Sequence, residues 1–225
     1  MKISVIIPAL NEAESIGATV AAMPWGEIAE CIVIDNESVD ATAEIARKAG
    51  ARVIAAPRGY GAAMSAGASA AVGEVLVFLD GDGADPVEEM QRIVEPVMRG
   101  EADLVLASRI LGKREAGSMQ DSQVFAGWLI GWMVRMIYGF RYTDMCAFRA
   151  IKRETVEKMR MREMTFGWNL EMQIKAVKMG LRVREIPVDY RCRIGGESKV
   201  SGNFRASVRA AWRILGVFWR VRNSG

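Results

Sequence analysis

The sequence predicts an α/β fold with a mainly parallel, Rossmann-like sheet and helices on both of its faces. Over the first 110 residues, short apolar runs typical of buried strands alternate with segments that carry helix signals. This alternation is typical of a parallel sheet, whose neighbouring strands are joined by crossover helices. The chain has 225 residues, which suits one large domain or two small ones, and 51% of them are hydrophobic, enough for a sizeable core.

Five strands are expected in this part of the chain, and the first is a continuous apolar run of the kind found in strands buried on both faces. Their ranges are 3–8, 31–35, 52–55, 75–79 and 104–106. Helices are expected at about 11–23, 39–49 and 59–72, and again after residue 85. Asn11 and Glu14 have the spacing of a capping box. Asp85 and Pro86 match the cap and the first position of the fourth helix.

After residue 110 the pattern changes to longer helices and polar loops. Polar loops are expected at 112–122 and 191–203, helices at about 153–160 and 168–179, and a strand at 182–188. The segment 124–140 is nearly all apolar, but its 17 residues include Arg135, so it is too short and too charged for a typical transmembrane helix. A buried helix and an interfacial helix both fit this segment, and Trp128 and Trp132 favour the membrane interface.

Charge is distributed unevenly along the chain, although the formal net charge is only +3. Residues 1–112 carry 8 basic and 17 acidic side chains, whereas residues 113–225 carry 22 and 10. The acidic half suits a metal site, and the basic half suits an anionic partner such as a membrane surface, a phosphate or a nucleic acid. No nucleic-acid-binding motif accompanies the basic residues, so we expect no nucleic acid partner.

The chain contains no histidine, which excludes Ser-His-Asp and Cys-His catalytic groups and every histidine-based zinc site. Its three cysteines, Cys31, Cys146 and Cys192, lie far apart and form no CxxC motif, so no disulfide framework is expected. The N-terminus runs directly into a strand-like segment without the features of a signal peptide. These observations predict a protein of the reducing cytoplasm.

Asp80 and Asp82 follow the predicted strand 75–79 in an Asp-Gly-Asp-Gly turn. Open α/β sheets bind their ligands at this carboxyl edge of the strands. Two carboxylates on such a turn can reach one Mg²⁺ or Mn²⁺ ion and a diphosphate, although a solvated turn would have the same sequence. Asp85 could be a third ligand, but its position before Pro86 fits the helix cap better.

Other polar side chains are expected at the same edge. Pro8, Asn11 and Glu12 follow the first strand without a GxGxxG motif, and Asp35 ends the second strand, where a carboxylate commonly meets a ribose or base. Basic side chains suited to phosphate follow later, either as ligands or as a solvated charged loop: Arg109, Arg149, Arg193 and Lys199.

Six segments, in order and at plausible spacing, resemble family 2 glycosyltransferases. They are SVIIPALNEAESI, VIDNESVDAT, RGYGAAMSAGASAAVGEVLVFLDGDGADP, ASRILG, DMCAFRAI and IPVDYRCRIGGESK. Within that family they are most similar to the branch of dolichol-phosphate mannose synthase and the polyprenyl-phosphate glycosyltransferases. The resemblance covers about residues 2–200. It implies a GT-A domain over 1–200, a GDP-mannose or UDP-glucose type of donor, Mg²⁺ or Mn²⁺, and inverting transfer to a polyprenyl phosphate.

The resemblance also implies roles for single residues. The nucleoside would be held by Pro8, Asn11, Glu12 and Asp35, and the metal and donor diphosphate by Asp80 and Asp82. Donor or acceptor phosphates would be met by Arg109, Arg149, Arg193, Ser198 and Lys199, and the catalytic residues would be Asp82, Arg109, Arg193 and Lys199. Asn36 and Ala84 replace an acidic residue and a glutamine that are frequent in the family, which leaves the identity of the donor open.

The acceptor is consistent with the absence of histidine. A polyprenyl phosphate is already an anionic nucleophile, whereas a hydroxyl acceptor would need a general base, for which Glu171 is the candidate. Glu171 would otherwise be a carboxylate on a helix surface. Two alternatives therefore stay open: a soluble family 2 enzyme with a hydroxyl acceptor, and a catalytically idle module that binds a sugar nucleotide or a membrane. The oligomeric state is not predicted.

The C-terminal segment 201–225 is expected to form a basic amphipathic helix, with five arginines and no acidic residue. Arg205, Arg209 and Arg213 recur at every fourth position, so they form one stripe. An apolar band is expected beside this stripe, made of Val208, Trp212, Leu215, Phe218 and Trp219. The pattern is typical of a helix at an anionic membrane surface, and a terminal helix packed on the domain is the alternative. We therefore expect peripheral association with the cytoplasmic face of a membrane.

Overall fold

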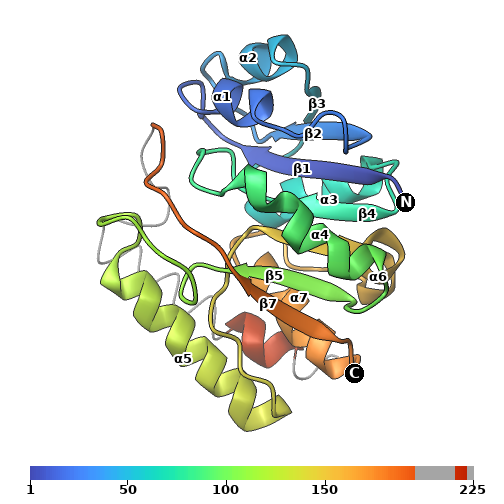
Figure 1. The fold of residues 1–225 in the computed structure, drawn as a ribbon, viewed down its shortest axis with the longest axis vertical. Helices are drawn as coiled ribbons and strands as arrows, with labels where there is room; N and C mark the ends of the chain where they lie inside the picture. The colour runs from blue at the N-terminus through green and yellow to red at the C-terminus, as the bar shows by residue number, and fades with distance from the viewer. Residues whose placement is uncertain (196–215, 222–225) are drawn as a thin grey trace.

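The computed structural model describes residues 1–195 and 216–221, and its described part contains one seven-stranded sheet (Figure 1). The strands lie in the order β3-β2-β1-β4-β6-β5-β7. Their bounds are β1 Ile3–Ala9, β2 Glu30–Asp35, β3 Arg52–Ala55, β4 Val75–Phe78, β5 Leu104–Ser108, β6 Arg149–Lys152 and β7 Val183–Pro187. The helices are α1 Ile16–Ala21, α2 Thr42–Lys48, α3 Tyr60–Ala70, η1 Val87–Glu89, α4 Met90–Met98, α5 Asp121–Tyr138, α6 Arg153–Met159 and α7 Trp168–Lys178.

The sheet is mainly parallel, as the sequence predicts. β1 pairs in parallel with β2 and β4, β2 with β3, and β5 with β7. β6 was not predicted, and it runs antiparallel between β4 and β5. Its four residues, Arg-Ala-Ile-Lys, begin and end with a charged side chain, so they do not form an apolar run like those that identified strands 3–8 and 75–79.

Helices cover both faces of the sheet because alternate residues of each strand point to opposite sides. Val5 and Ile7 of β1 pack in one buried cluster with α1, α2 and α4. Ile6 belongs to the second cluster, together with α3, α5, α6, α7 and residues 216–221. These two helix layers confirm the prediction of helices on both faces of the sheet.

Two predicted helix caps are wrong. α1 begins at Ile16, and Asn11 instead adopts a left-handed φ of 51° while its Oδ1 accepts a hydrogen bond from the Val39 N–H. Asp85 does not cap a helix either. Its Oδ2 accepts a hydrogen bond from the Asp80 N–H, because the loop after β4 folds back on itself before η1 begins.

α5 is half-buried rather than fully enclosed. Ile130 and Val134 face the core, and Gly131 lets the helix approach closely, because a Cβ there would lie 2.1 Å from the Tyr142 carbonyl oxygen. The opposite side exposes large apolar side chains, namely Phe125, Trp128, Leu129, Trp132, Met136 and Ile137. No helix in the described ranges is long and apolar enough to cross a membrane.

The C-terminal turn packs on the domain. The stripe of Arg205, Arg209 and Arg213 lies outside the described residues, but residues 216–221 are helical. Phe218, expected in a lipid-facing band, is instead only 2% exposed, between Val217 and Val221, which are also buried. Lys178 Nζ donates to the Val221 carbonyl oxygen at 2.9 Å. This turn therefore follows the alternative of a helix packed on the domain.

Truncating Phe218 should therefore destabilise the fold. We expect Phe218→Ala to lower the free energy of unfolding by about 3 kcal/mol, since it removes a buried aromatic side chain and leaves a cavity. Urea denaturation followed by circular dichroism measures this. Trp219→Ala is the matched control, because Trp219 is 56% exposed and its loss should cost at most about 0.5 kcal/mol. Equal effects of the two substitutions would contradict the assignment of Phe218 to the core.

Candidate active site

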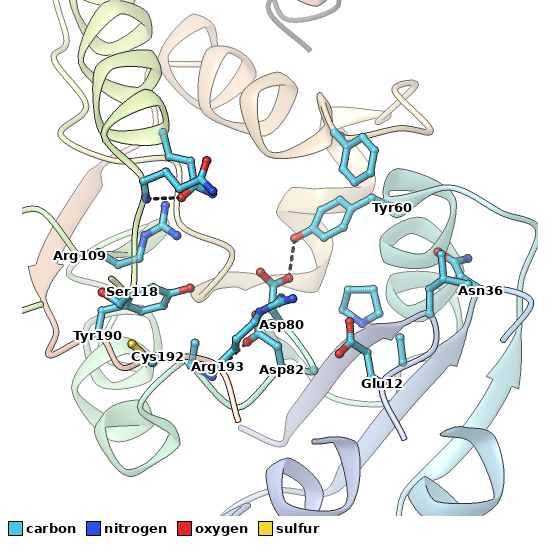
Figure 2. A pocket seen from close by; sticks show the side chains of 18 of the residues that line it. Glu12, Asn36, Tyr60, Asp80, Asp82, Arg109, Ser118, Tyr190, Cys192 and Arg193 are labelled. Carbon is cyan, nitrogen blue, oxygen red and sulfur yellow. Dashed lines mark hydrogen bonds and ion pairs between the residues drawn. The ribbon is translucent and has the colours of Figure 1, made fainter. Parts of the chain in front are cut away.

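A cavity of about 760 Å³ lies at the carboxyl edge of the sheet (Figure 2). Pro8 reaches it from β1, Asp80 and Asp82 from the turn after β4, and Arg109 from the end of β5. Tyr190 and Arg193 enter from the segment that follows β7. The parallel strands end at this edge, which explains why residues far apart in the sequence line one cavity.

Carboxylates gather in the turn after β4, where Asp80 and Asp82 line the cavity and Asp85 lies beside them. Burial, followed by the charges of Asp85 and Asp82, raises the pKa of Asp80 to about 8. Burial also raises the pKa of Asp85 to about 6, although a hydrogen bond from the Asp80 N–H opposes the shift. The Ala84 N–H donates to Asp82 Oδ1 at 3.0 Å and holds the turn. The ionised form of these carboxylates is therefore unfavourable on its own, and a cation in the cavity would stabilise it.

This cluster fits a divalent cation only if substrate supplies part of the coordination. The described residues contain no group of three or more histidine, cysteine, aspartate or glutamate side chains placed to hold a metal. Mg²⁺ and Mn²⁺ are usually held by one or two carboxylates together with phosphate oxygens and water. Asp80 and Asp82 provide two such carboxylates, and the crowding of charge around Asp80 is what a cation would relieve.

Arg193 covers the acidic turn. Its Nη2 pairs with Asp82 Oδ2 at 2.7 Å, and the Ile194 N–H donates to the Asp82 carbonyl oxygen at 3.0 Å. The Nη1 of Arg193 is buried and has no hydrogen-bond partner within the described ranges. The Nη1 N–H groups, at one edge of the guanidinium, can therefore donate to an anion in the cavity. Ser198 and Lys199, predicted to act beside Arg193, lie outside the described residues.

Arg109 is held in a fixed orientation by Asp144. Its Nε and Nη2 each donate to one carboxylate oxygen at 2.7 Å, and its backbone N–H donates to the same side chain at 3.0 Å. Although burial acts to raise it, these bonds and the charge of Arg109 lower the pKa of Asp144. Tyr190 stacks under the guanidinium at 5.0 Å. Asp144 accepts from Nε and Nη2, so Nη1 is the guanidinium nitrogen of Arg109 that does not bond to Asp144.

Two of the four residues predicted to hold the nucleoside line the cavity, and two do not. Pro8 and Glu12 line the cavity, together with Asn36, whose Nδ2 donates to the Pro57 carbonyl oxygen at 2.8 Å. Asn11 and Asp35 are not among the lining residues. Asn11 accepts from Val39 as described above, and Asp35 Oδ1 accepts from the Ser38 N–H at 3.2 Å, so both shape the loop after β2.

Arg149 is not in the cavity, contrary to the expectation that it meets a phosphate. It begins β6 and is fully buried, since β6 lies between two other strands. Its N–H groups donate to the carbonyl oxygens of Cys146, Ala147 and Asn169. A guanidinium enclosed in this way stabilises the backbone around it rather than a ligand.

Glu171 is also outside the cavity, and it is buried instead of lying on a helix surface. Its oxygens accept from the N–H groups of Arg162 and Glu163, and it pairs with Lys175 at 2.8 Å. Its position supports the loop before α7 and does not suit a base for an acceptor in the cavity.

Several lining residues were missed by the sequence analysis. They are Arg58, Tyr60, Ser118, Gln120, Gln123, Thr165, Phe166 and Tyr190. Tyr60 lies between two glycines in a stretch that was interpreted only as a packed helix, and Gln120 and Gln123 form a capping box at the start of α5. Fold geometry alone brings them to the cavity, because they come from four separate segments.

The family follows from sequence comparison. Residues 4–181 match the model of glycosyl transferase family 2, so the chain belongs to this family and is a glycosyltransferase by descent. It is 36% identical over 221 residues to an uncharacterized glycosyltransferase of Mycobacterium tuberculosis, with 97% of each chain covered. It is 31% identical over 208 residues to a dolichyl-phosphate hexose transferase of Haloferax volcanii, covering 88% of this chain and 86% of the relative.

Two further comparisons concern a more distant relative and the fold. The chain is 29% identical over 220 residues to an undecaprenyl-phosphate mannosyltransferase of Micrococcus luteus, covering 90% of this chain and 88% of the relative. Among solved structures, a complex of glucosyl-3-phosphoglycerate synthase from Mycobacterium tuberculosis with Mn²⁺, UDP-glucose and phosphoglyceric acid matches with a TM-score of 0.78. That match has 20% identity and covers 98% of this chain and 79% of the other. It confirms the GT-A fold.

The fork between Arg109 and Asp144 yields a test. We expect Arg109→Lys to lower glycosyl transfer about 100-fold, because lysine keeps the charge but cannot form the bidentate bond that aims it into the cavity. Steady-state turnover measures this. Arg182→Lys is the matched control, since Arg182 makes the same fork with Asp103 at the exposed surface. Similar turnover in both variants would show that the Arg109 fork has no role in transfer.

Proposed function

We propose that this chain transfers a sugar, with inversion, from a nucleotide-diphosphate donor to a polyprenyl phosphate in a reaction that depends on Mg²⁺ or Mn²⁺. The observation that carries the proposal is the meeting of Asp80 and Asp82 with Arg109 and Arg193 in one cavity. Carboxylates of this kind suit a cation bound to a diphosphate, and the arginines suit phosphate oxygens. The cavity thus offers complementary charge to both the donor and a phosphate acceptor.

The donor would lie over the turn after β4. A bound cation would neutralise charge on the departing diphosphate. Arg193, which now pairs with Asp82, would turn its guanidinium toward the diphosphate, and its buried Nη1, for which the described residues offer no partner, would donate to a phosphate oxygen. Pro8, Glu12 and Asn36 line the side on which the nucleoside would lie.

The acceptor phosphate would approach Arg109. A phosphate monoester needs no base to become a nucleophile, and the part of the chain that lines the cavity contains no histidine. Glu171, the candidate base for a hydroxyl acceptor, lies outside the cavity. The names of the relatives from Haloferax volcanii and Micrococcus luteus describe transfer to dolichyl and undecaprenyl phosphate. These observations favour a polyprenyl phosphate over a soluble hydroxyl acceptor.

The exposed apolar side of α5 supports peripheral attachment to the cytoplasmic face of a membrane. Gln120 and Gln123 line the cavity at the start of this helix (α5, lower left in Figure 1). Phe125, Trp128 and Trp132 follow at helical spacing and are about half exposed, at 62%, 50% and 48%. Tryptophan is enriched at membrane–water interfaces. A membrane on this side of α5 would hold a lipid-linked acceptor close to the cavity.

Metal and acceptor are tested together. We expect transfer from a UDP- or GDP-sugar to undecaprenyl phosphate in detergent, loss of transfer in excess EDTA, and recovery with Mn²⁺ or Mg²⁺. Asp82→Asn should lower turnover at least about 100-fold because it removes a charge aimed at the cation.

A thermal-shift panel of sugar nucleotides with and without Mn²⁺ identifies the donor, since a ligand of the folded state raises its stability. Preferred transfer to 3-phosphoglycerate, or full activity in EDTA, would contradict the proposal.

Membrane attachment has its own test. We expect the double variant Trp128→Gln and Trp132→Gln to bind anionic phospholipid vesicles several-fold more weakly in a flotation assay. High salt should release the wild type only in part, because salt screens charge but not apolar insertion. Trp25→Gln is the matched control, since Trp25 is also exposed, at 41%, but lies in the loop after α1. Failure of the wild type to float, or equal losses in both variants, would favour a soluble enzyme.

A further inference from the structure

The Tyr60 hydroxyl contacts the side chain of Asp80, one of the two carboxylates proposed to bind the cation. Tyr60 is the first residue of α3 and lines the cavity, and its hydroxyl lies 3.5 Å from Asp80 Oδ1 (Figure 2). The Asp80 backbone N–H is already bonded to Asp85. Within the described ranges, Tyr60 is the hydrogen-bond partner of the Asp80 side chain, and no second one is found. Tyr60 is therefore placed to orient the Asp80 carboxylate.

The direction of this contact is set by Asn169. Its Nδ2 donates to the Tyr60 hydroxyl oxygen at 3.3 Å. A phenol that accepts one hydrogen bond still has its own proton to donate. That proton can be given to Asp80, so the chain of bonds runs from Asn169 through Tyr60 to the carboxylate. A donated proton stabilises the ionised carboxylate, the form that binds a cation.

Tyr60 is held by the two glycines beside it. A Cβ at Gly61 would lie 2.1 Å from the Glu163 carbonyl oxygen, and one at Gly59 would lie 2.5 Å from that of Met164. The start of α3 is therefore pressed against the loop before α7, and the Ala62 N–H donates to Met164 at 3.1 Å. The Tyr60 ring also stacks on Phe166, with centroids 6.3 Å apart.

Arg149 holds the other end of the chain of bonds. Its Nη1 donates to the Asn169 carbonyl oxygen at 3.3 Å, and it makes no ion pair with any described residue. This buried cation contacts the first turn of α7 through the Asn169 carbonyl oxygen, and it holds the segment before β6 through those of Cys146 and Ala147. Arg149 thus contributes to the site from inside the core, which is a different role from the phosphate contact that the sequence suggested.

We propose that Tyr60 is a positioning residue that orients Asp80 for the cation, with Asn169 and Arg149 holding Tyr60 in place. The proposal rests on the proposed cation-dependent transfer. Groups that hydrogen-bond to metal ligands typically affect metal affinity or activity by about 10- to 100-fold when they are removed. Tyr60→Phe removes only the hydroxyl and keeps the ring on Phe166, so it isolates this contact.

The experiment measures Mn²⁺ binding without turnover. Free Mn²⁺ is followed by electron paramagnetic resonance during titration of the full chain in the presence of the nucleoside diphosphate of its donor. We expect Tyr60→Phe to raise the dissociation constant of Mn²⁺ about 10-fold, and Asn169→Ala to raise it about 3-fold. At saturating Mn²⁺, kcat of Tyr60→Phe should return to near the wild-type value, which a general structural defect would not allow.

Tyr142→Phe is the matched control. The Tyr142 hydroxyl donates to the Gln173 carbonyl oxygen at 2.9 Å in the core, away from the cavity. This variant should lose thermal stability and keep its affinity for Mn²⁺. Wild-type affinity in Tyr60→Phe, with lost affinity in Asp80→Asn, would overturn the role of Tyr60 and leave the proposed function standing. Absence of Mn²⁺ binding by the wild type would overturn the cation-dependent function itself.

Discussion

Negative charge concentrated at the end of β4 is the constraint on which the rest of the site depends. Asp80, Asp82 and Asp85 lie within one short turn, and burial with mutual repulsion raises the pKa of Asp80 to about 8. Nearby cations stabilise the ionised form of such a turn. Arg193 pairs with Asp82, and the charge of Arg109 acts to lower the pKa of Asp80 against these larger effects. The proposed transfer thus has a physical basis in a cluster of carboxylates and arginines whose charge a cation and a diphosphate would complete.

The antiparallel strand β6 explains how Arg109 obtains its partner. The parallel strands end at the cavity, whereas an antiparallel strand begins there. The segment that leads into β6 therefore passes the end of β5, and it carries Asp144 to the guanidinium of Arg109. Glu185 of β7 fixes this segment by accepting from the Thr143 N–H and hydroxyl groups at 2.9 Å. The antiparallel direction of β6 thus brings the end of β5, the segment before β6 and β7 together around Arg109.

The sequence predicted most of what depends on strand ends, although Asp35 at the end of β2 does not line the cavity, and it missed what depends on side-chain direction. Pro8, Asp80 and Arg109 were expected at one edge because parallel strands finish together, and they share one cavity. Arg149 was expected to bind a phosphate, but the pairing of β6 places its side chain in the core. Tyr60 was missed because glycines on either side suggested only close packing. The tertiary structure decides which loop those glycines pack against, and no local sequence pattern predicts it.

The position of α5 connects the proposed membrane surface to the proposed chemistry. Its exposed apolar residues extend from Phe125 to Ile137, a distance of about 18 Å along the helix axis at 1.5 Å per residue. A helix of that length lying flat in the interface would keep its first turn, and with it Gln120 and Gln123 of the cavity wall, at the level of the lipid headgroups. The phosphate of a polyprenyl lipid lies at that same level while its chain stays in the hydrocarbon. In this arrangement the acceptor would need to move only along the membrane plane to reach Arg109, so the anchoring helix and the phosphate-binding arginine would act on the same molecule.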